Sequence, residues 1–241
     1  MSRQATTYDP RVAKKARSAN QEDGTKAART RERILDAAAH VLSRKGYSGT
    51  RLGDIAEQAQ IQAPAIYYYF GSREELIEEV MWAGVHRLHQ HVSGALEQLP
   101  ADTPPMEQIL KAVEAHLHIE LELSDFATAA IRNAGQLPEE LRTRQLAAEA
   151  EYSKLWRGLL TDLNAAGQLR SDLDPIIAHL LVVGALNWAA EWWNPRRGSF
   201  DAVVRSAQSL VRYGLSSRAQ LAEPDEEPAR PRRRQATRRT P

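Results

Sequence analysis

The chain has 241 residues, of which 42% are hydrophobic and 26% charged, and its formal net charge is +1 at pH 7. This balance is typical of a soluble globular protein, and it excludes a uniformly basic nucleic-acid coat and an acidic disordered chain. Cysteine is absent, which excludes disulfide bridges, cysteine nucleophiles and cysteine-bound zinc and agrees with a cytoplasmic location.

The two ends of the chain differ in character from its middle. Residues 1–25 are polar and basic, and residues 218–241 combine a short acidic run with arginine and proline, so we expect two disordered arms. Their charge serves solubility in one interpretation and contact with DNA phosphates in the other. The charged N-terminus predicts no secretion signal. The most apolar run, 176–190, is too short to span a membrane and predicts a buried helix.

Between the arms, apolar residues recur at the helical period almost throughout, which predicts an all-α protein. A first helix carries its apolar face over residues 34–42 and ends at Gly46. Thr50 is a suitable N-cap for a short second helix, and Pro64 is acceptable in the first turn of a short third helix. The stretch 72–75 forms a capping box that opens a long fourth helix.

Two short helices joined by a tight turn and braced by a longer one form a helix-turn-helix, whose second short helix fits the major groove of DNA. Characteristic stretches follow in order: Ile34-Leu35-Asp36-Ala37-Ala38, Lys45-Gly46-Tyr47, Thr50, Asp54-Ile55-Ala56, Ala65-Ile66-Tyr67-Tyr68-Tyr69-Phe70 and Ser72-Arg73-Glu74-Glu75-Leu76. With them, residues 30–80 resemble the DNA-binding region of the TetR family of bacterial repressors. We therefore predict a three-helix helix-turn-helix domain over 26–79 and an antiparallel helical domain for effector binding and dimerisation over 80–217.

The candidate DNA contacts lie on or beside the two short helices and at the start of the fourth helix. Thr50 and Arg51 open the first of them, where backbone N–H groups and a hydroxyl can hold phosphate. Tyr67 and Tyr68 can donate hydrogen bonds to phosphate, and the resemblance implies the same role for them and for Arg73. Glutamine can pair with adenine, whereas alanine and proline pack on thymine methyl groups, so we expect an A·T-leaning operator. The candidate base-reading residues are Gln62, Ala63, Pro64 and Ala65.

The second domain continues as longer helices, expected over 106–123, 124–134, 138–166, 175–193 and from 199 onward. Asp174 and Ser199 are the expected N-caps of the last two. The last two are apolar over more surface than one neighbour would cover, and their small residues allow close approach. We expect them to form a seam between two copies, because a two-fold pair of helix-turn-helix units reads a palindrome. The alternative is that these faces fill the core of one chain. The predicted seam comprises Ile177, Leu181, Gly184, Leu210, Val211 and Gly214.

Arg132-Asn133 with Leu137-Pro138, the stretch 152–157, and Asn187-Trp188 through Trp192-Trp193-Asn194-Pro195 resemble one subgroup of the family. That subgroup represses steroid-ring and fatty-acid breakdown, and several of its members respond to acyl-CoA thioesters. Aromatic side chains suit an apolar slot and arginines suit the CoA phosphates. The alternatives are tryptophans used for core or dimer packing, and a small aromatic or drug-like effector. The candidate ligand-binding residues are Trp82, Arg132, Tyr152, Trp156, Arg157, Trp188 and Trp192.

Other classes of protein fit the sequence less well. The chain has no phosphate-binding loop, dinucleotide fingerprint, nucleophile elbow or zinc-protease motif, so we expect no enzyme and no cofactor. The histidines between 86 and 118 lack a tight cluster of carboxylates, so we expect no metal site. A helical adaptor would leave the TetR-like stretches unexplained. The sequence predicts a ligand-responsive transcriptional regulator, a homodimeric repressor released from a palindromic operator when an effector shifts the fourth helix.

Overall fold

The computed structural model describes residues 10–196 and 198–217, with side chains from residue 25 onward. The described residues confirm the all-α prediction, because their one strand-like pairing is an isolated bridge between Leu169 and Ser216. The elements, with η1 a π-helical and η2 a 3-10 turn, are α1 (Pro10–Gly49), α2 (Leu52–Gln58), α3 (Ala63–Ile66), α4 (Arg73–Glu97), α5 (Pro105–His118), η1 (Ile119–Leu123), α6 (Asp125–Asn133), η2 (Glu139–Leu141), α7 (Thr143–Ala165), α8 (Pro175–Asn187), α9 (Ala189–Trp192) and α10 (Phe200–Leu215).

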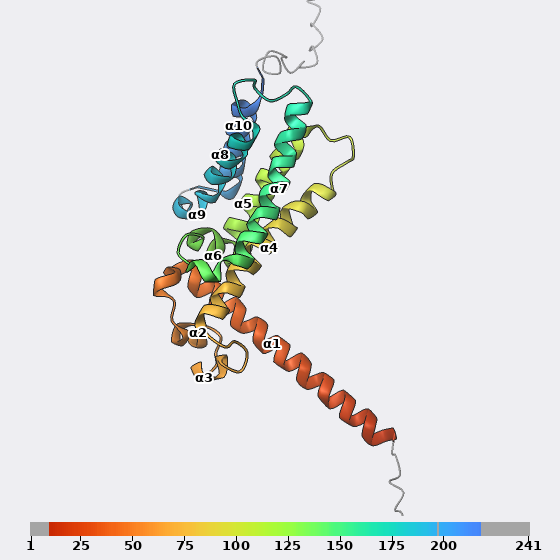
Figure 1. The fold of residues 1–241 in the computed structure, drawn as a ribbon, viewed down its shortest axis with the longest axis vertical. Helices are drawn as coiled ribbons and strands as arrows, with labels where there is room; N and C mark the ends of the chain where they lie inside the picture. The colour runs from red at the N-terminus through yellow and green to blue at the C-terminus, as the bar shows by residue number, and fades with distance from the viewer. Residues whose placement is uncertain (1–9, 197, 218–241) are drawn as a thin grey trace, which may run out of the picture.

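Helix α1 is longer than predicted, and its N-terminal part projects away from the body of the molecule (Figure 1). We expected a disordered arm up to residue 25, whereas the helix begins at Pro10. The added segment contains several alanine, lysine and arginine residues, which favour helix. The predicted helix end is confirmed, because Gly46 leaves helical geometry with a φ of 69° that suits glycine. The outer parts of the predicted arms, 1–9 and 218–241, lie outside the described residues.

The first domain packs around an apolar core shared by α1, α2, α3 and the start of α4. Ile34 and Leu42 of α1 meet Ile55 of α2, Ile66 of α3 and Phe70 beyond it, and all five side chains are buried. Helix α3 has only four residues, too few to be stable alone, so these contacts hold it in place.

The starts of three helices agree with the capping residues predicted from the sequence. Ser72, Asp174 and Ser199 each accept a hydrogen bond from a backbone N–H in the first turn of α4, α8 and α10, respectively. Two predicted helices are interrupted instead of continuous. The one expected over 138–166 is split into η2 and α7, and the one over 175–193 is split at Trp188 into α8 and α9.

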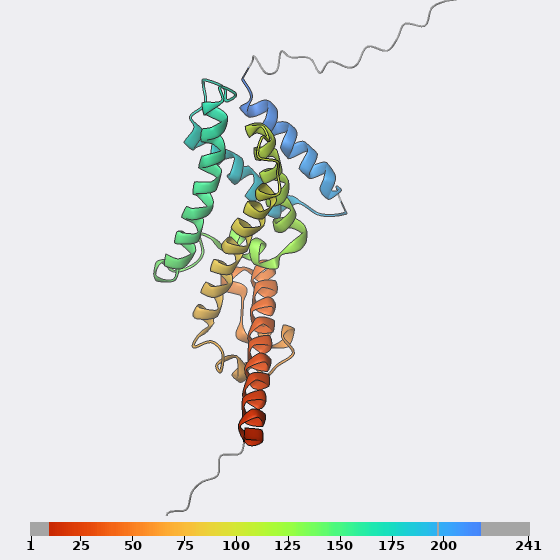
Figure 2. The ribbon, with the colours of Figure 1, turned by 90° about the vertical axis from the view of Figure 1, so that its right-hand side faces the viewer.

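Helix α4 runs from the first domain into the second, where α6 crosses it closely (Figure 2). The crossing depends on Gly84. A Cβ at this position would lie 2.2 Å from the carbonyl oxygen of Phe126 and 2.7 Å from the Cβ of Ala130. A second apolar core, with Trp156 and Leu160 of α7 at its centre, fills the space among α4, α5, α7 and α8.

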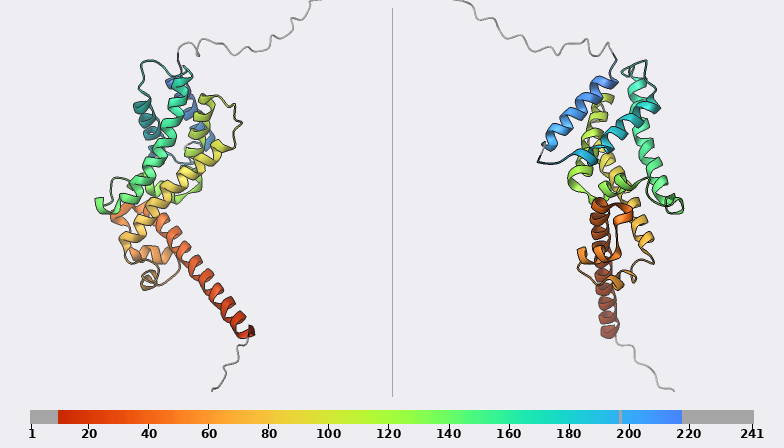
Figure 3. Two further views of the ribbon diagram at one scale, coloured as in Figure 1. Left: turned by 45° about the vertical axis from the view of Figure 1, so that its right-hand side comes forward. Right: turned by 90° about the vertical axis from the view of Figure 1, so that its left-hand side faces the viewer.

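Helices α8 and α10 lie on one side of the second domain (Figure 3). Their apolar outer face is not covered by the rest of the described chain. Ile177 and Leu181 of α8 are 54% and 67% exposed, and Leu210 of α10 is 76% exposed. A groove of about 590 Å³ between the two helices, here called the outer groove, continues this face. The prediction of a buried helix over 176–190 is therefore wrong for the single chain, because α8 is apolar on its outer side as well. By length and composition alone, Pro175–Trp192 would pass as a membrane span, with 33% of it buried.

Candidate DNA-binding and effector sites

Helix α2, the turn that follows it and α3 form the end of the first domain that points away from the second domain (Figure 1). Gln62 is the N-cap of α3 and is exposed, as is Pro64, whereas the two alanines of α3 are half-buried. Tyr67 and Tyr68 follow directly and are 59% and 87% exposed. The predicted base-reading residues and both tyrosines therefore lie together, with hydrogen-bonding side chains directed at solvent.

Two of the predicted phosphate contacts are engaged within the protein. Thr50 is 2% exposed, and its hydroxyl donates to the carbonyl of Gly46 at 2.7 Å. The prediction that Thr50 caps the second helix is therefore wrong, and Arg51 is the N-cap. Arg73 donates to the carbonyl of Thr50 at 2.8 Å and to that of Tyr47, and its guanidinium stacks 4.6 Å from the Tyr47 ring centre. Both residues thus shape the connection between α1 and α2, beside the exposed Arg51.

A cavity of about 400 Å³ lies inside the second domain, walled by α4, α6, α7 and α8. We name it the inner cavity. Its wall is mainly apolar and includes the predicted ligand-binding residues Tyr152 and Trp156, both buried. Polar groups occur on the sides formed by α7 and α8, where the hydroxyl of Ser153 and Nε2 of His179 are 3.0 Å apart and Asn187 lies at the end of α8. The arrangement suits an apolar ligand that carries a few hydrogen-bonding groups.

The other predicted ligand-binding residues do not line the inner cavity. Trp82 stacks on a neighbouring histidine of α4, Trp188 is exposed, and Trp192 borders the outer groove. Arg132 donates its hydrogen bonds to protein carbonyls. Arg157 is exposed on α7, one residue beyond the cavity wall. The sequence shows which aromatic and basic residues are present, but only the packing of the helices shows which of them line the cavity and which lie on the surface.

Sequence reasoning missed a buried polar cluster beside the inner cavity. Nδ1 of His116 is 2.7 Å from the hydroxyl of Tyr152, and its Nε2 is 3.1 Å from a carboxylate oxygen of Glu120. Burial raises the pKa of Glu120, an effect that the contact with His116 partly offsets, and burial also raises the pKa of Tyr152. Burial and the nearby charge of Arg157 lower the pKa of His179. The spacing of His116 and Glu120 by one helical turn, within a largely apolar helix, is the signal that sequence reasoning could have used.

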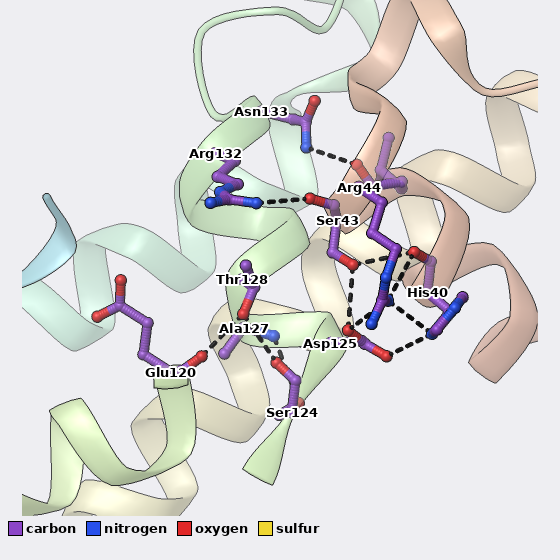
Figure 4. Close-up of polar contacts among 11 residues, drawn as sticks. His40, Ser43, Arg44, Glu120, Ser124, Asp125, Ala127, Thr128, Arg132 and Asn133 are labelled. Carbon is purple, nitrogen blue, oxygen red and sulfur yellow. Dashed lines mark hydrogen bonds and ion pairs between the residues drawn. The ribbon is translucent and has the colours of Figure 1, made fainter. Parts of the chain in front are cut away.

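Both ends of α6 are fastened to α1 (Figure 4). At its start, the carboxylate of Asp125 accepts hydrogen bonds from Ser43 at 3.1 Å and from Arg44 at 3.2 Å. At its end, the buried side chain of Asn133 accepts the backbone N–H of Tyr47 at 2.8 Å. Because α6 also forms part of the wall of the inner cavity, it links that cavity directly to the first domain.

An exposed pair of short helices, held by the buried face of α1 and followed by a mainly helical second domain, defines a helix-turn-helix DNA-binding protein. Residues 34–80 match the family model described as bacterial regulatory proteins, tetR family. Residues 102–214 match that of the tetracyclin repressor-like C-terminal domain. The chain belongs to the TetR family, whose members are DNA-binding transcriptional regulators and not enzymes.

Similar proteins agree with this assignment. The HTH-type transcriptional repressor KstR2 of Rhodococcus jostii (strain RHA1) is 25% identical over 190 residues, which cover 78% of this chain and 91% of that protein. The structure of AibR in complex with isovaleryl coenzyme A and operator DNA is 18% identical, with a TM-score of 0.68 over 75% of this chain and 97% of that one. The structure of FadR from Bacillus subtilis in complex with stearoyl-CoA is 20% identical, with a TM-score of 0.63 over 76% and 98%.

Proposed function

We propose that this regulator is a homodimeric repressor that binds a palindromic operator in the cytoplasm and is released from it by an acyl-CoA. The observation that carries the proposal is the inner cavity, a mainly apolar space connected through α6 and α4 to the exposed reading surface at α3. An effector that binds more tightly to a form in which the two DNA-binding domains are differently placed lowers the affinity for DNA. The coupling between effector and DNA binding equals the difference in effector affinity between the two forms.

The exposure and the chemistry of the side chains support the proposed DNA contacts. Arg51, Gln62, Tyr67 and Tyr68 are exposed at one end of the molecule. Tyrosine hydroxyls and arginine suit phosphate, and Gln62 at the start of α3 suits a base edge in the major groove. Thr50 and Arg73 act in this proposal mainly by holding the connection that presents Arg51.

The uncovered face of α8 and α10 supports the homodimer. Large aliphatic side chains exposed in a contiguous apolar face mark an interaction surface, and a two-fold pair of these helices would form a four-helix interface. Pairing through this face would place the helix-turn-helix domains of both chains on one side of the dimer, as a palindromic operator requires.

The acyl-CoA assignment rests on the chemistry of the cavity and on the relatives. Tyr152 and Trp156 present aromatic walls to an acyl or ring group, and Arg157 lies close enough to His179 for its charge to act there. Arg157 is therefore the predicted arginine best placed for a phosphate of the CoA part. Two proteins of this fold were crystallised with acyl-CoA thioesters. The aromatic walls also suit a small aromatic or drug-like effector, which is the second candidate.

The deciding experiment is a fluorescence-anisotropy titration of the protein against DNA from upstream of its own gene. It is carried out alone and with stearoyl-CoA, isovaleryl-CoA or the corresponding free acids. We expect a thioester, and not its acid, to weaken binding about tenfold or more. Tight binding that no thioester changes would contradict the acyl-CoA assignment and favour the aromatic effector.

Tyr68→Ala tests the reading surface in the same assay. Tyr68 is 87% exposed, so its removal should leave the melting temperature unchanged. Operator affinity should fall about tenfold, because a hydrogen bond to a charged group contributes roughly 1.5 kcal/mol. Tyr68→Phe separates the hydroxyl from the ring. If both variants bind the operator as tightly as the unaltered protein, Tyr68 does not contribute to operator binding.

A further inference from the structure

The backbone N–H and carbonyl of Ala190, in α9, both bond to ionisable side chains, the buried Glu120 and the half-buried Arg132. A carboxylate oxygen of Glu120 accepts the N–H of Ala190 at 3.2 Å. The guanidinium of Arg132 donates to the carbonyl of the same residue. Glu120 comes from the π-helical turn η1, whereas Arg132 comes from α6. The short helix that follows α8 is thereby tied to two elements distant in sequence.

Arg132 extends this attachment to the first domain. Its Nη1 donates to the carbonyl of Ser43 in α1 at 3.0 Å, and its Nε lies 3.0 Å from a carboxylate oxygen of Glu191 in α9 (Figure 4 shows the contact with Ser43). Two nitrogens of the guanidinium therefore donate hydrogen bonds, and the third, Nε, forms an ion pair without a hydrogen bond. One side chain joins α1, α6 and α9, and the group is planar and rigid enough to fix their relative positions.

Helix α9 directly follows a wall of the inner cavity. The last residue of α8, Asn187, lines that cavity, and only Trp188 separates it from α9. A ligand that displaces α8 therefore displaces Ala190 and Glu191 as well. Hydrogen bonds of about 3 Å weaken steeply once the donor and acceptor separate beyond about 3.5 Å, so a small shift is enough to release Arg132 from one of its partners.

We propose that Arg132 is the positioning residue through which the inner cavity controls the DNA-binding domain, and that it does not contact the effector. In the form that binds DNA, its guanidinium would hold Ser43 and Ala190 together and keep α1 in the position that presents α3. Displacement of α9 breaks this connection and releases α1. The inference rests on the proposed function only in requiring that the inner cavity takes the effector.

The test compares Arg132→Met, which keeps an unbranched apolar side chain but removes the guanidinium, and Arg132→Lys with the unaltered protein. Arg170→Met is the matched control, because Arg170 also pairs with a carboxylate and lies near a backbone carbonyl, but in the connection before α8. Hydrogen exchange of the effector-free protein is measured first. We expect Arg132→Met to speed exchange both in α9 and around Tyr47 at the end of α1, with neither region affected in Arg170→Met. Faster exchange confined to α9 would overturn the proposal, since the connection would then not reach α1.

The second measurement uses stearoyl-CoA and the operator duplex. In the unaltered protein the thioester should weaken operator binding about tenfold or more, and in Arg132→Met this ratio should approach one. The affinity of the DNA-free dimer for stearoyl-CoA should stay within about twofold, and Arg132→Lys should restore part of the ratio. A large loss of stearoyl-CoA affinity in Arg132→Met would make Arg132 a ligand contact and overturn the proposal. If stearoyl-CoA has no effect on the unaltered protein, the acyl-CoA assignment fails, and the exchange measurement alone decides the role of Arg132.

Discussion

Leu210→Glu is expected to prevent dimerisation and to weaken operator binding about a hundredfold or more. Two linked DNA-binding domains bind far more tightly than one. Leu210 is 76% exposed on α10 and borders the outer groove, in the middle of the apolar face. A glutamate there costs little in the single chain, since it meets water. In a dimer it would bury an unpaired charge, which is strongly unfavourable.

Sedimentation velocity gives the oligomeric state, and fluorescence anisotropy gives the operator affinity. Leu146→Glu, at an exposed leucine of α7 outside the outer groove, is the control and should remain dimeric. A Leu210→Glu variant that stays dimeric and binds the operator normally would show that the uncovered face of α8 and α10 is not the subunit interface.

Gly84→Ala is expected to destabilise the fold by about 3 kcal/mol, at the upper end of the usual cost of overpacking. The added methyl group would lie 2.2 Å from a backbone carbonyl oxygen of Phe126, so α4 and α6 would have to separate. The same substitution gains up to about 1 kcal/mol of helix propensity, which the clash outweighs. Because α4 continues into the first domain and α6 is attached to α1, operator affinity should fall as well.

Gly94→Ala, in the same helix, is the matched control, because no atom lies within 4 Å of a Cβ added there. It should raise the free energy of unfolding by up to about 1 kcal/mol through helix propensity alone. Urea unfolding followed by circular dichroism compares the two variants. Equal stabilisation by both substitutions would contradict the close crossing of α4 and α6.

If both predictions hold, two DNA-binding domains are joined by one apolar interface, and the close crossing of α4 and α6 holds each chain together. The two substitutions then separate its parts. Leu210→Glu should remove DNA binding without loss of stability in the single chain, whereas Gly84→Ala should reduce both together. Arg132→Met should differ from each, because it should lower operator affinity without the effector and leave little further response when the effector is added.

The sequence by itself determined the local structure of this protein. Helical periodicity predicted the all-α fold, Gly46 the end of the first helix, and Ser72, Asp174 and Ser199 the starts of three others. These features depend on residues within about one helical turn of each other, so the pattern along the chain contains the necessary information. The same holds for the helix-turn-helix, whose short elements and turns follow one another directly.

Only the tertiary structure decided what the polar and aromatic side chains do. Arg132 bonds to Ser43 and Ala190, which are 89 and 58 residues away in sequence, and so it acts within the protein instead of lining the inner cavity. Trp156 lines that cavity whereas Trp188 is exposed, although both are tryptophans within helices predicted for the second domain. These outcomes depend on which helix faces are brought together, and burial and hydrogen bonding between distant residues are properties of the packed fold.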